Sequence, residues 1–167
     1  MIRLATIDAA KLSDEAHAAV LERVLRYAQH LGAIDPAPIL AACQGPSNVR
    51  LSVHQLAHYA LTGTPPEGRA EMIGEYIQTL VDLDLVPDSE TLRGERDPSE
   101  PLHVVTMAAL ARERLDKRQS IPEAWLAVLA GVAASRIRQL VGAGELRRTS
   151  DGIHAADARR WLEGRKQ

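Results

Sequence analysis

The chain has 167 residues, 46% of them hydrophobic and 25% charged, which excludes a disordered tail and a membrane protein. Lysine and arginine total 20 against 22 acidic residues, so the net charge is -2. No segment approaches the ~18–20 consecutive apolar residues of a transmembrane helix, and the N-terminal residues lack the apolar core of a secretory signal. Cys43 is the only cysteine, which excludes an intramolecular disulfide and a cysteine-cluster zinc site. We therefore expect a cytoplasmic protein.

The charge is unevenly distributed along the chain. Residues 1–110 contain 8 basic and 15 acidic side chains, a net charge of -7, whereas residues 111–167 contain 12 and 7, a net charge of +5. A basic segment of this kind is typical of a polyanion-binding module. Arginine-rich helices that only increase solubility are the alternative explanation. Alanine and leucine, together 47 residues, favour helices throughout the chain.

Four helices are predicted in the N-terminal part of the chain, over residues 13–31, 35–42, 52–63 and 67–84. Ser13 and Ser52 are the expected N-caps of the first and third helices. The fourth helix has an apolar stripe, formed by Met72, Ile73, Tyr76, Ile77, Leu80 and Val81. Its neighbours are short, so part of this stripe is expected to remain for a second copy of the chain. We therefore expect residues 1–90 to form an acidic homodimerisation or partner-binding module.

A polar segment follows this module. Residues 87–101 contain three prolines and one glycine and lack hydrophobic periodicity, which is typical of a linker. We expect the linker over residues 91–101 and a second module over 102–167. The second module is expected to begin with a helix from about residue 102 to 118, where apolar residues recur at helical spacing.

Two short helices joined by a tight turn are predicted next. Ser120 and Glu123 form the pattern of a capping box at the start of the first. Gly131 begins the turn, and Gly144 ends the second helix. An extended segment at 146–149, an Asp-Gly turn and a returning segment at 153–154 predict a β-hairpin, and a closing helix is predicted over 156–164. The expected fold is therefore all-α, with a C-terminal winged helix-turn-helix whose wing has two short strands.

Four short motifs mark the last quarter of the chain: Leu-Ala-Gly-Val at 129–132, Arg-Ile-Arg at 136–138, Gly-Glu-Leu at 144–146 and Asp-Ala-Arg-Arg-Trp-Leu at 157–162. With these motifs, the segment resembles the excisionase-like and MerR-type winged helix-turn-helix family. This resemblance implies that the second helix enters the major groove of DNA and that the wing touches the backbone or the minor groove. The chain departs from the family at Ala133, where a serine or threonine cap is common, and in its shorter wing.

Seven residues are candidates for DNA contact. The inner face of the second helix carries Ile137, Leu140 and Val141, which leaves Ser135, Arg138 and Gln139 on its outer face. Arginine can pair with guanine O6 and N7, glutamine with adenine N6 and N7, and serine with a base or a phosphate. The residues expected to contact phosphates are Arg136 on the helix and Arg147, Arg148 and Thr149 on the wing.

These patterns favour sequence-specific binding of double-stranded DNA by a protein that is not an enzyme and needs no cofactor or metal. A transcriptional repressor or a control factor of a mobile element is the expected role, by analogy with the family alone. One alternative is a protein-interaction adaptor whose helix-turn-helix does not bind DNA. The other is a small metal-dependent hydrolase that uses His54 and His58, which lie four residues apart but lack an intervening glutamate in the metalloprotease position.

Overall fold

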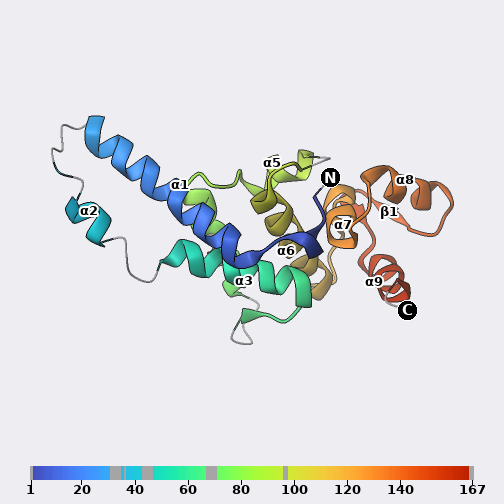
Figure 1. Cartoon of the computed structure of the whole chain (residues 1–167). Coiled ribbons are helices and arrows are strands. Elements are labelled where there is room, and N and C mark those ends of the chain that lie inside the picture. Colours follow the sequence, from blue (N-terminus) through green and yellow to red (C-terminus); the bar gives the residue numbers. More distant parts are fainter. Residues whose placement is uncertain are drawn as a thin grey trace.

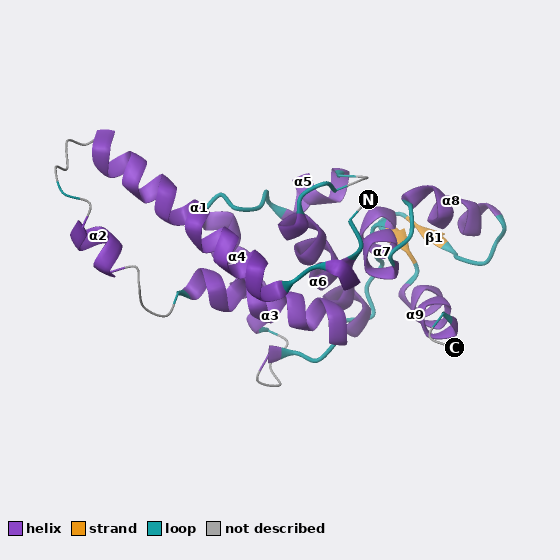
Figure 2. Cartoon of the chain, viewed as in Figure 1, coloured by secondary structure: helices purple, strands orange, loops and turns teal. Residues whose placement is uncertain are grey.

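The computed structural model describes residues 2–30, 35, 37–42, 47–66, 71–95 and 98–165. Helices dominate these residues and one two-stranded antiparallel sheet accompanies them, which confirms the predicted all-α class (Figures 1 and 2). In chain order the elements are η1 (Leu4–Thr6), α1 (Ala9–His30), α2 (Ala37–Ala42), α3 (Asn48–Thr62), α4 (Met72–Asp82), α5 (Ser89–Gly94), α6 (Pro101–Asp116), α7 (Glu123–Ala130), α8 (Ala134–Gly142), β1 (Arg148–Thr149), β2 (Gly152–Ile153) and α9 (Ala155–Gly164).

Helix α6 joins the two halves of the molecule. It packs against α3 on one side and against α7 on the other. Buried residues occur on every side of α6, because it lies between these two helices and is covered on both faces. Figure 1 shows α8, the hairpin and α9 at one end of the molecule, and the far end of α1 with α2 at the other.

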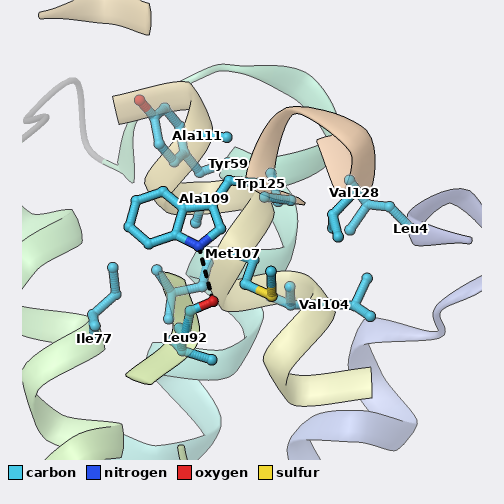
Figure 3. Close-up of a cluster of buried hydrophobic side chains, with 14 of the residues drawn as sticks. Leu4, Tyr59, Ile77, Leu92, Val104, Met107, Ala109, Ala111, Trp125 and Val128 are labelled. Carbon is cyan, nitrogen blue, oxygen red and sulfur yellow. Dashed lines mark hydrogen bonds between the residues drawn. The ribbon is translucent and has the colours of Figure 1, made fainter. Parts of the chain in front are cut away.

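The buried hydrophobic residues form a single cluster that extends across both predicted modules. Figure 3 shows part of this cluster, in which Trp125 of α7 lies near Tyr59 of α3 and Met107 of α6. The indole Nε1 of Trp125 donates a hydrogen bond to the carbonyl oxygen of Leu92 at 3.2 Å. The C-terminal helices therefore pack directly on the N-terminal ones.

The prediction of a linker over residues 91–101 is wrong for its first part, which belongs to helix α5. The carboxylate of Asp88 caps this helix and accepts hydrogen bonds from the amides of Glu90 and Thr91, at 3.0 and 2.9 Å. Leu92 is completely buried and accepts the Trp125 bond. A helix of six residues has too few turns to show a hydrophobic period, so the sequence pattern could not reveal it.

The two serines predicted as N-caps lie inside their helices. Helix α3 begins earlier, because the hydroxyl of Ser47 accepts the amide of Arg50 at 3.4 Å, and Ser52 is buried within the helix. Helix α1 also begins earlier, after Asp8, and the hydroxyl of Ser13 donates to the carbonyl of Ala9 at 2.6 Å. Both segments contain several residues that favour caps, and the upstream one is used.

The apolar stripe of α4 is consumed by the core of the same chain. Ile73, Tyr76, Ile77 and Leu80 are all buried. Met72 and Val81 are partly buried, so the core of the same chain takes most of the stripe and leaves little of it for a second copy. The predicted start of this helix at 67, the predicted end of the first helix at 31, and Cys43 lie outside the described residues.

Among the described residues, no single helix is both long enough and apolar enough to cross a membrane. Helices α7 and α8 pass that test of length and composition only when taken together, and they are bent by 113° relative to each other. The five buried residues of α7 are used in the protein core.

Candidate nucleic-acid interface

Helices α7 and α8 are connected by a three-residue turn and lie at 113° to each other. Gly131 ends α7 in the left-handed conformation, with φ of 65°. Residues with a side chain rarely adopt this conformation. Ile137 and Leu140 are buried and attach α8 to the rest of the unit. The predicted inner face of this helix is confirmed for these two residues, and the bend lies in the range of 90–120° typical of two helices joined in this way.

The β-hairpin is fixed to the body of the protein at its base. Arg148 pairs with Ile153 and Thr149 with Gly152 in antiparallel register. Ile121, just before α7, exchanges two backbone hydrogen bonds with Ile153, at 2.9 and 2.7 Å. Gly152 has φ of 137°, and a Cβ at this position would overlap the carbonyl of Ile121. Only glycine therefore allows the hairpin to lie this close to the segment that enters α7.

The predicted capping box at Ser120 and Glu123 is wrong. Helix α7 begins after Pro122 and has no side-chain cap. The backbone at Ile121 is extended along the hairpin, so Ser120 lies before the capping position, and its hydroxyl instead accepts a hydrogen bond from Thr149 at 2.8 Å. Glu123 is thereby free to turn toward the hairpin, where its Oε1 lies 3.4 Å from Nε of Arg148.

The outer face of α8 presents the four polar residues that the sequence singled out, and all four are exposed: Ser135, Arg136, Arg138 and Gln139. Nη1 of Arg136 donates to Oε1 of Gln139 at 3.4 Å. Arg138 makes no side-chain hydrogen bond or ion pair within the part of the chain that the structure describes. This face therefore offers donors and acceptors to a partner without first breaking strong internal contacts.

The three wing residues proposed for phosphate contact differ in their surroundings. Arg147 forms two hydrogen bonds with the buried carboxylate of Asp157 on α9, Nε to Oδ2 at 2.7 Å and Nη2 to Oδ1 at 3.1 Å. These bonds hold the pKa of Asp157 at about 2 and raise the pKa of Arg147. Thr149 is held by Ser120 and by the carbonyl of Gly152, so Arg148, with a side chain 69% exposed, is the wing residue most open to a partner.

A groove of about 410 Å³ separates α8 from the hairpin. Its lining includes Arg138 of α8, Arg148 of the wing, Glu123 of α7 and, unexpectedly, Arg93 of α5. The sequence analysis did not identify Arg93, because it lies in the segment taken for a linker. Its partner Asp151 is 58 residues away, and no local pattern signals a contact over that separation.

The charges in this groove are partly balanced. Arg93 pairs with Asp151 at 3.6 Å, and Arg148 pairs with Glu123 at 3.4 Å. Oε1 of Glu123 is buried and has no hydrogen-bond partner among the described residues. Both ion pairs are long and their arginines are partly exposed, so a phosphate can compete with either acid for its arginine.

The two histidines of the hydrolase alternative lie on α3 with exposed side chains. Among the described residues, no three histidine, cysteine, aspartate or glutamate side chains lie close enough together to hold a metal ion. His58 instead faces the hydroxyl of Thr62 at 3.5 Å. Nothing in this region therefore adds to the histidine spacing that motivated the metal hypothesis.

Comparison of the chain with protein-family models, with curated proteins and with solved structures finds no match. The resemblance to the excisionase-like family therefore stays a prediction from the residues quoted for it.

Proposed function

We propose that the chain binds double-stranded DNA through a winged helix-turn-helix composed of α7, α8, the β1–β2 hairpin and α9. The observation that carries this proposal is the juxtaposition of two exposed features across one groove. One is the polar outer face of α8, and the other is Arg148 on the hairpin. A helix of this kind fits the major groove, and an arginine beside it can reach the flanking phosphates.

The roles of individual residues follow from their exposure and contacts. Arg138 and Gln139 are the candidates for base edges, since both are exposed and Arg138 has no competing partner among the described residues. Ser135 and Arg136 lie on the same exposed face and suit a base or a phosphate. Arg148 suits a phosphate.

Arg147 and Thr149, first predicted as phosphate ligands, are better explained as residues that position the wing. Arg147 attaches β1 to α9 through Asp157, and Thr149 attaches it to Ser120. A DNA contact by either residue would compete with bonds that the free protein already makes. We propose that Arg147 and Thr149 order the wing, and that Arg148 makes the main contact between the wing and the DNA backbone.

The biological role that fits this activity is control of transcription or of a mobile element, as the family resemblance implies. A single helix reads few base pairs, and many such proteins double the contact through a two-fold axis. Homodimerisation stays a prediction for this chain, but its surface must be sought away from α4. Among the described residues, the exposed large hydrophobic side chains are those of Val24, Tyr27, Leu51 and Leu61.

Titration of the full-length chain against a random-sequence duplex tests the proposal. We expect binding at low salt. The logarithm of the binding constant should fall linearly with the logarithm of the salt concentration, because phosphate contacts release counterions. The double substitution Arg136→Ala and Arg138→Ala should weaken binding at least tenfold. The double substitution Lys11→Ala and Arg26→Ala, which removes two exposed charges from α1, is the matched control and should change little. Absence of binding at low salt would refute the proposal and favour the adaptor alternative.

A further inference from the structure

The tip of the hairpin is held by a residue from outside the C-terminal unit, which is formed by residues 121–165. Nη2 of Arg93 on α5 donates a hydrogen bond to the carbonyl oxygen of Asp151 at 3.0 Å and lies 3.6 Å from its carboxylate. Asp151 belongs to the turn between β1 and β2. The contact therefore joins the N-terminal half of the chain to the outermost part of the wing.

Helix α5 is a firm anchor for this contact. Leu92, next to Arg93, is completely buried, and its carbonyl accepts the indole Nε1–H of Trp125 at 3.2 Å. Asp88 caps the helix with two backbone hydrogen bonds. Arg93 thus extends toward the wing from a backbone that is tied to the protein core, and only 33% of its side chain is exposed.

Apart from the bond between Thr149 and Ser120 at 2.8 Å, which lies beside the turn, the wing has few contacts that would order its tip. Its strands contain two residues each, and the bridge to Ile121 lies at the base. At the turn, the amide of Asp151 donates to the hydroxyl of Thr149 at 3.3 Å, which is a contact within the hairpin. Among the described residues, the Arg93 bonds are the side-chain contacts that join Asp151 to the rest of the protein.

We propose that Arg93 is a positioning residue for DNA binding: it fixes the wing tip through Asp151 and thereby presents Arg148 to the phosphate backbone. This inference rests on the proposed function. A wing that is ordered before binding loses less conformational entropy when DNA arrives, so its contact contributes more to affinity. The DNA-binding surface accordingly depends on α5 and is not confined to residues 121–165.

Arg93 could instead contact a phosphate directly, since it lines the same groove as Arg138 and Arg148. The two roles give different results in a double-mutant cycle. A positioning residue acts through Arg148, so its removal has little effect once Arg148 is gone. An independent phosphate ligand loses the same factor in either background.

The experiment compares the full-length wild type with Arg93→Ala, Arg148→Ala and the double variant, by titration of a random-sequence duplex. We expect Arg93→Ala to weaken binding roughly threefold to tenfold in the wild-type background and less than about twofold in the Arg148→Ala background. Arg93→Lys should recover part of the loss, because lysine can still donate to the Asp151 carbonyl. Equal factors in the two backgrounds, or no effect of Arg93→Ala, would overturn the inference.

Amide hydrogen exchange in the free protein gives a readout that does not involve DNA. In Arg93→Ala, the amides of residues 149–152 should exchange several times faster, while the core amides of α6 keep their wild-type rates. Unchanged exchange in the turn would overturn the positioning role even if DNA affinity falls. If the wild type does not bind DNA at all, the proposed function fails, whereas faster exchange at the wing would still show that Arg93 orders it.

Discussion

The C-terminal unit of residues 121–165 and the N-terminal helices α1, α3 and α4 are organised by different kinds of contact. In the C-terminal unit, glycines with positive φ lie at or beside the breaks between elements: Gly131 follows α7, Gly144 lies two residues after α8, and Gly152 begins β2. In the N-terminal region, distant side chains complete the helix ends. Arg23 of α1 donates to the carbonyls of Leu83 and Asp84 just beyond α4, both at 2.7 Å. Glycine conformations therefore locate the breaks of the C-terminal unit, whereas the N-terminal region combines one such glycine, Gly63 at the end of α3, with arginine bonds from distant helices to helix-end carbonyls.

The use of arginine at helix ends also changes the meaning of the charge distribution. Arg112 donates to the carbonyls of Ala60 and Leu61 at the end of α3. Arg159 donates to Leu115 at the end of α6, at 2.8 Å. These contacts satisfy carbonyls that a helix leaves free at its C-terminus. Part of the +5 charge of residues 111–167 is therefore structural, and the proposed DNA surface is a smaller set than the total charge indicates.

The largest effect is expected from a substitution at Gly152, where the hairpin packs closely against the backbone of Ile121. Gly152→Ala should lower the free energy of unfolding by about 3 kcal/mol, because the new Cβ would overlap the Ile121 carbonyl at a φ that disfavours side chains. Thermal unfolding measures this loss. Gly142→Ala is the matched control: a Cβ there meets no described atom within 4 Å, so a change within about 1 kcal/mol is expected. Equal effects of the two substitutions would show that the hairpin is not packed as described.

A smaller effect is expected where α3 meets α6, the helix that lies between the two regions. The phenol of Tyr59 on α3 donates to Oδ2 of Asp116 at 2.6 Å, so Tyr59→Phe should cost about 1–1.5 kcal/mol. Tyr27→Phe, at a side chain 71% exposed, should cost almost nothing and serves as the control. Chemical denaturation compares the two. A loss of stability no larger than that of Tyr27→Phe would contradict the role of this bond in joining α3 to α6.

The same tyrosine predicts an alkaline limit on stability. Burial, and then the hydrogen bond to Asp116, raise the pKa of Tyr59 above its ordinary value of 10.0. The unfolded chain releases the proton at lower pH than the folded protein, so the contribution of Tyr59 is present below pH 10 and is lost as pH rises beyond it. Above pH 10, the free energy of unfolding of Tyr59→Phe should fall less steeply with pH than that of the wild type. Parallel losses in both proteins would contradict this assignment.

The wing should show the opposite pH dependence. The hydrogen bonds from Arg147 lower the pKa of Asp157 from its ordinary 3.8 to about 2. Its stabilising contribution is therefore complete above pH 4 and is lost as pH falls from about 4 toward 2. Asp157→Asn should lower the unfolding midpoint at neutral pH and flatten its dependence between pH 4 and 2. Calorimetry at a series of pH values tests this, and an unchanged slope in the variant would count against the bond.

The smallest expected effect is a change in DNA affinity caused by the negative charge of Glu123 in the groove. Glu123→Gln removes a negative charge beside Arg148 while keeping the shape of the side chain, so affinity for random duplex DNA should rise roughly twofold to fivefold. Glu15→Gln makes the same change in net charge on α1, where no such rise is expected. A fall in affinity, or an equal rise in both variants, would show that Glu123 does not oppose phosphate contact at this site.

The sequence predicted much of the C-terminal unit because its signals are local. The spacing of Ile137 and Leu140 identified the buried face of α8, and the Asp151-Gly152 pair identified the hairpin turn. Helix α5 was not predicted because Leu92 is its one buried residue. The cap at Ser47 was not predicted because Ser52, a second serine that could cap the helix, lies downstream. Long-range pairs lie beyond such patterns.

The candidate site likewise divides into features that local sequence predicts and contacts that it does not predict. The exposed residues of α8 followed from the helical period once the inner face was known. The partner of Arg147 is ten residues away on helix α9, and the partner of Arg93 is 58 residues away. Sequence spacing identified which arginines belong to the unit, but it could not show which of them are already engaged.

Selection of bound sequences from a pool of random duplex DNA by the full-length chain tests the DNA-binding proposal most directly. We expect enrichment of a defined sequence. Arg138→Ala should relax the preference at one position by about 1–3 kcal/mol, whereas Arg148→Ala should weaken binding to all sequences nearly equally. Failure of the wild type to bind or enrich any duplex at low salt would contradict the proposal that α8 and the wing form a DNA-reading surface.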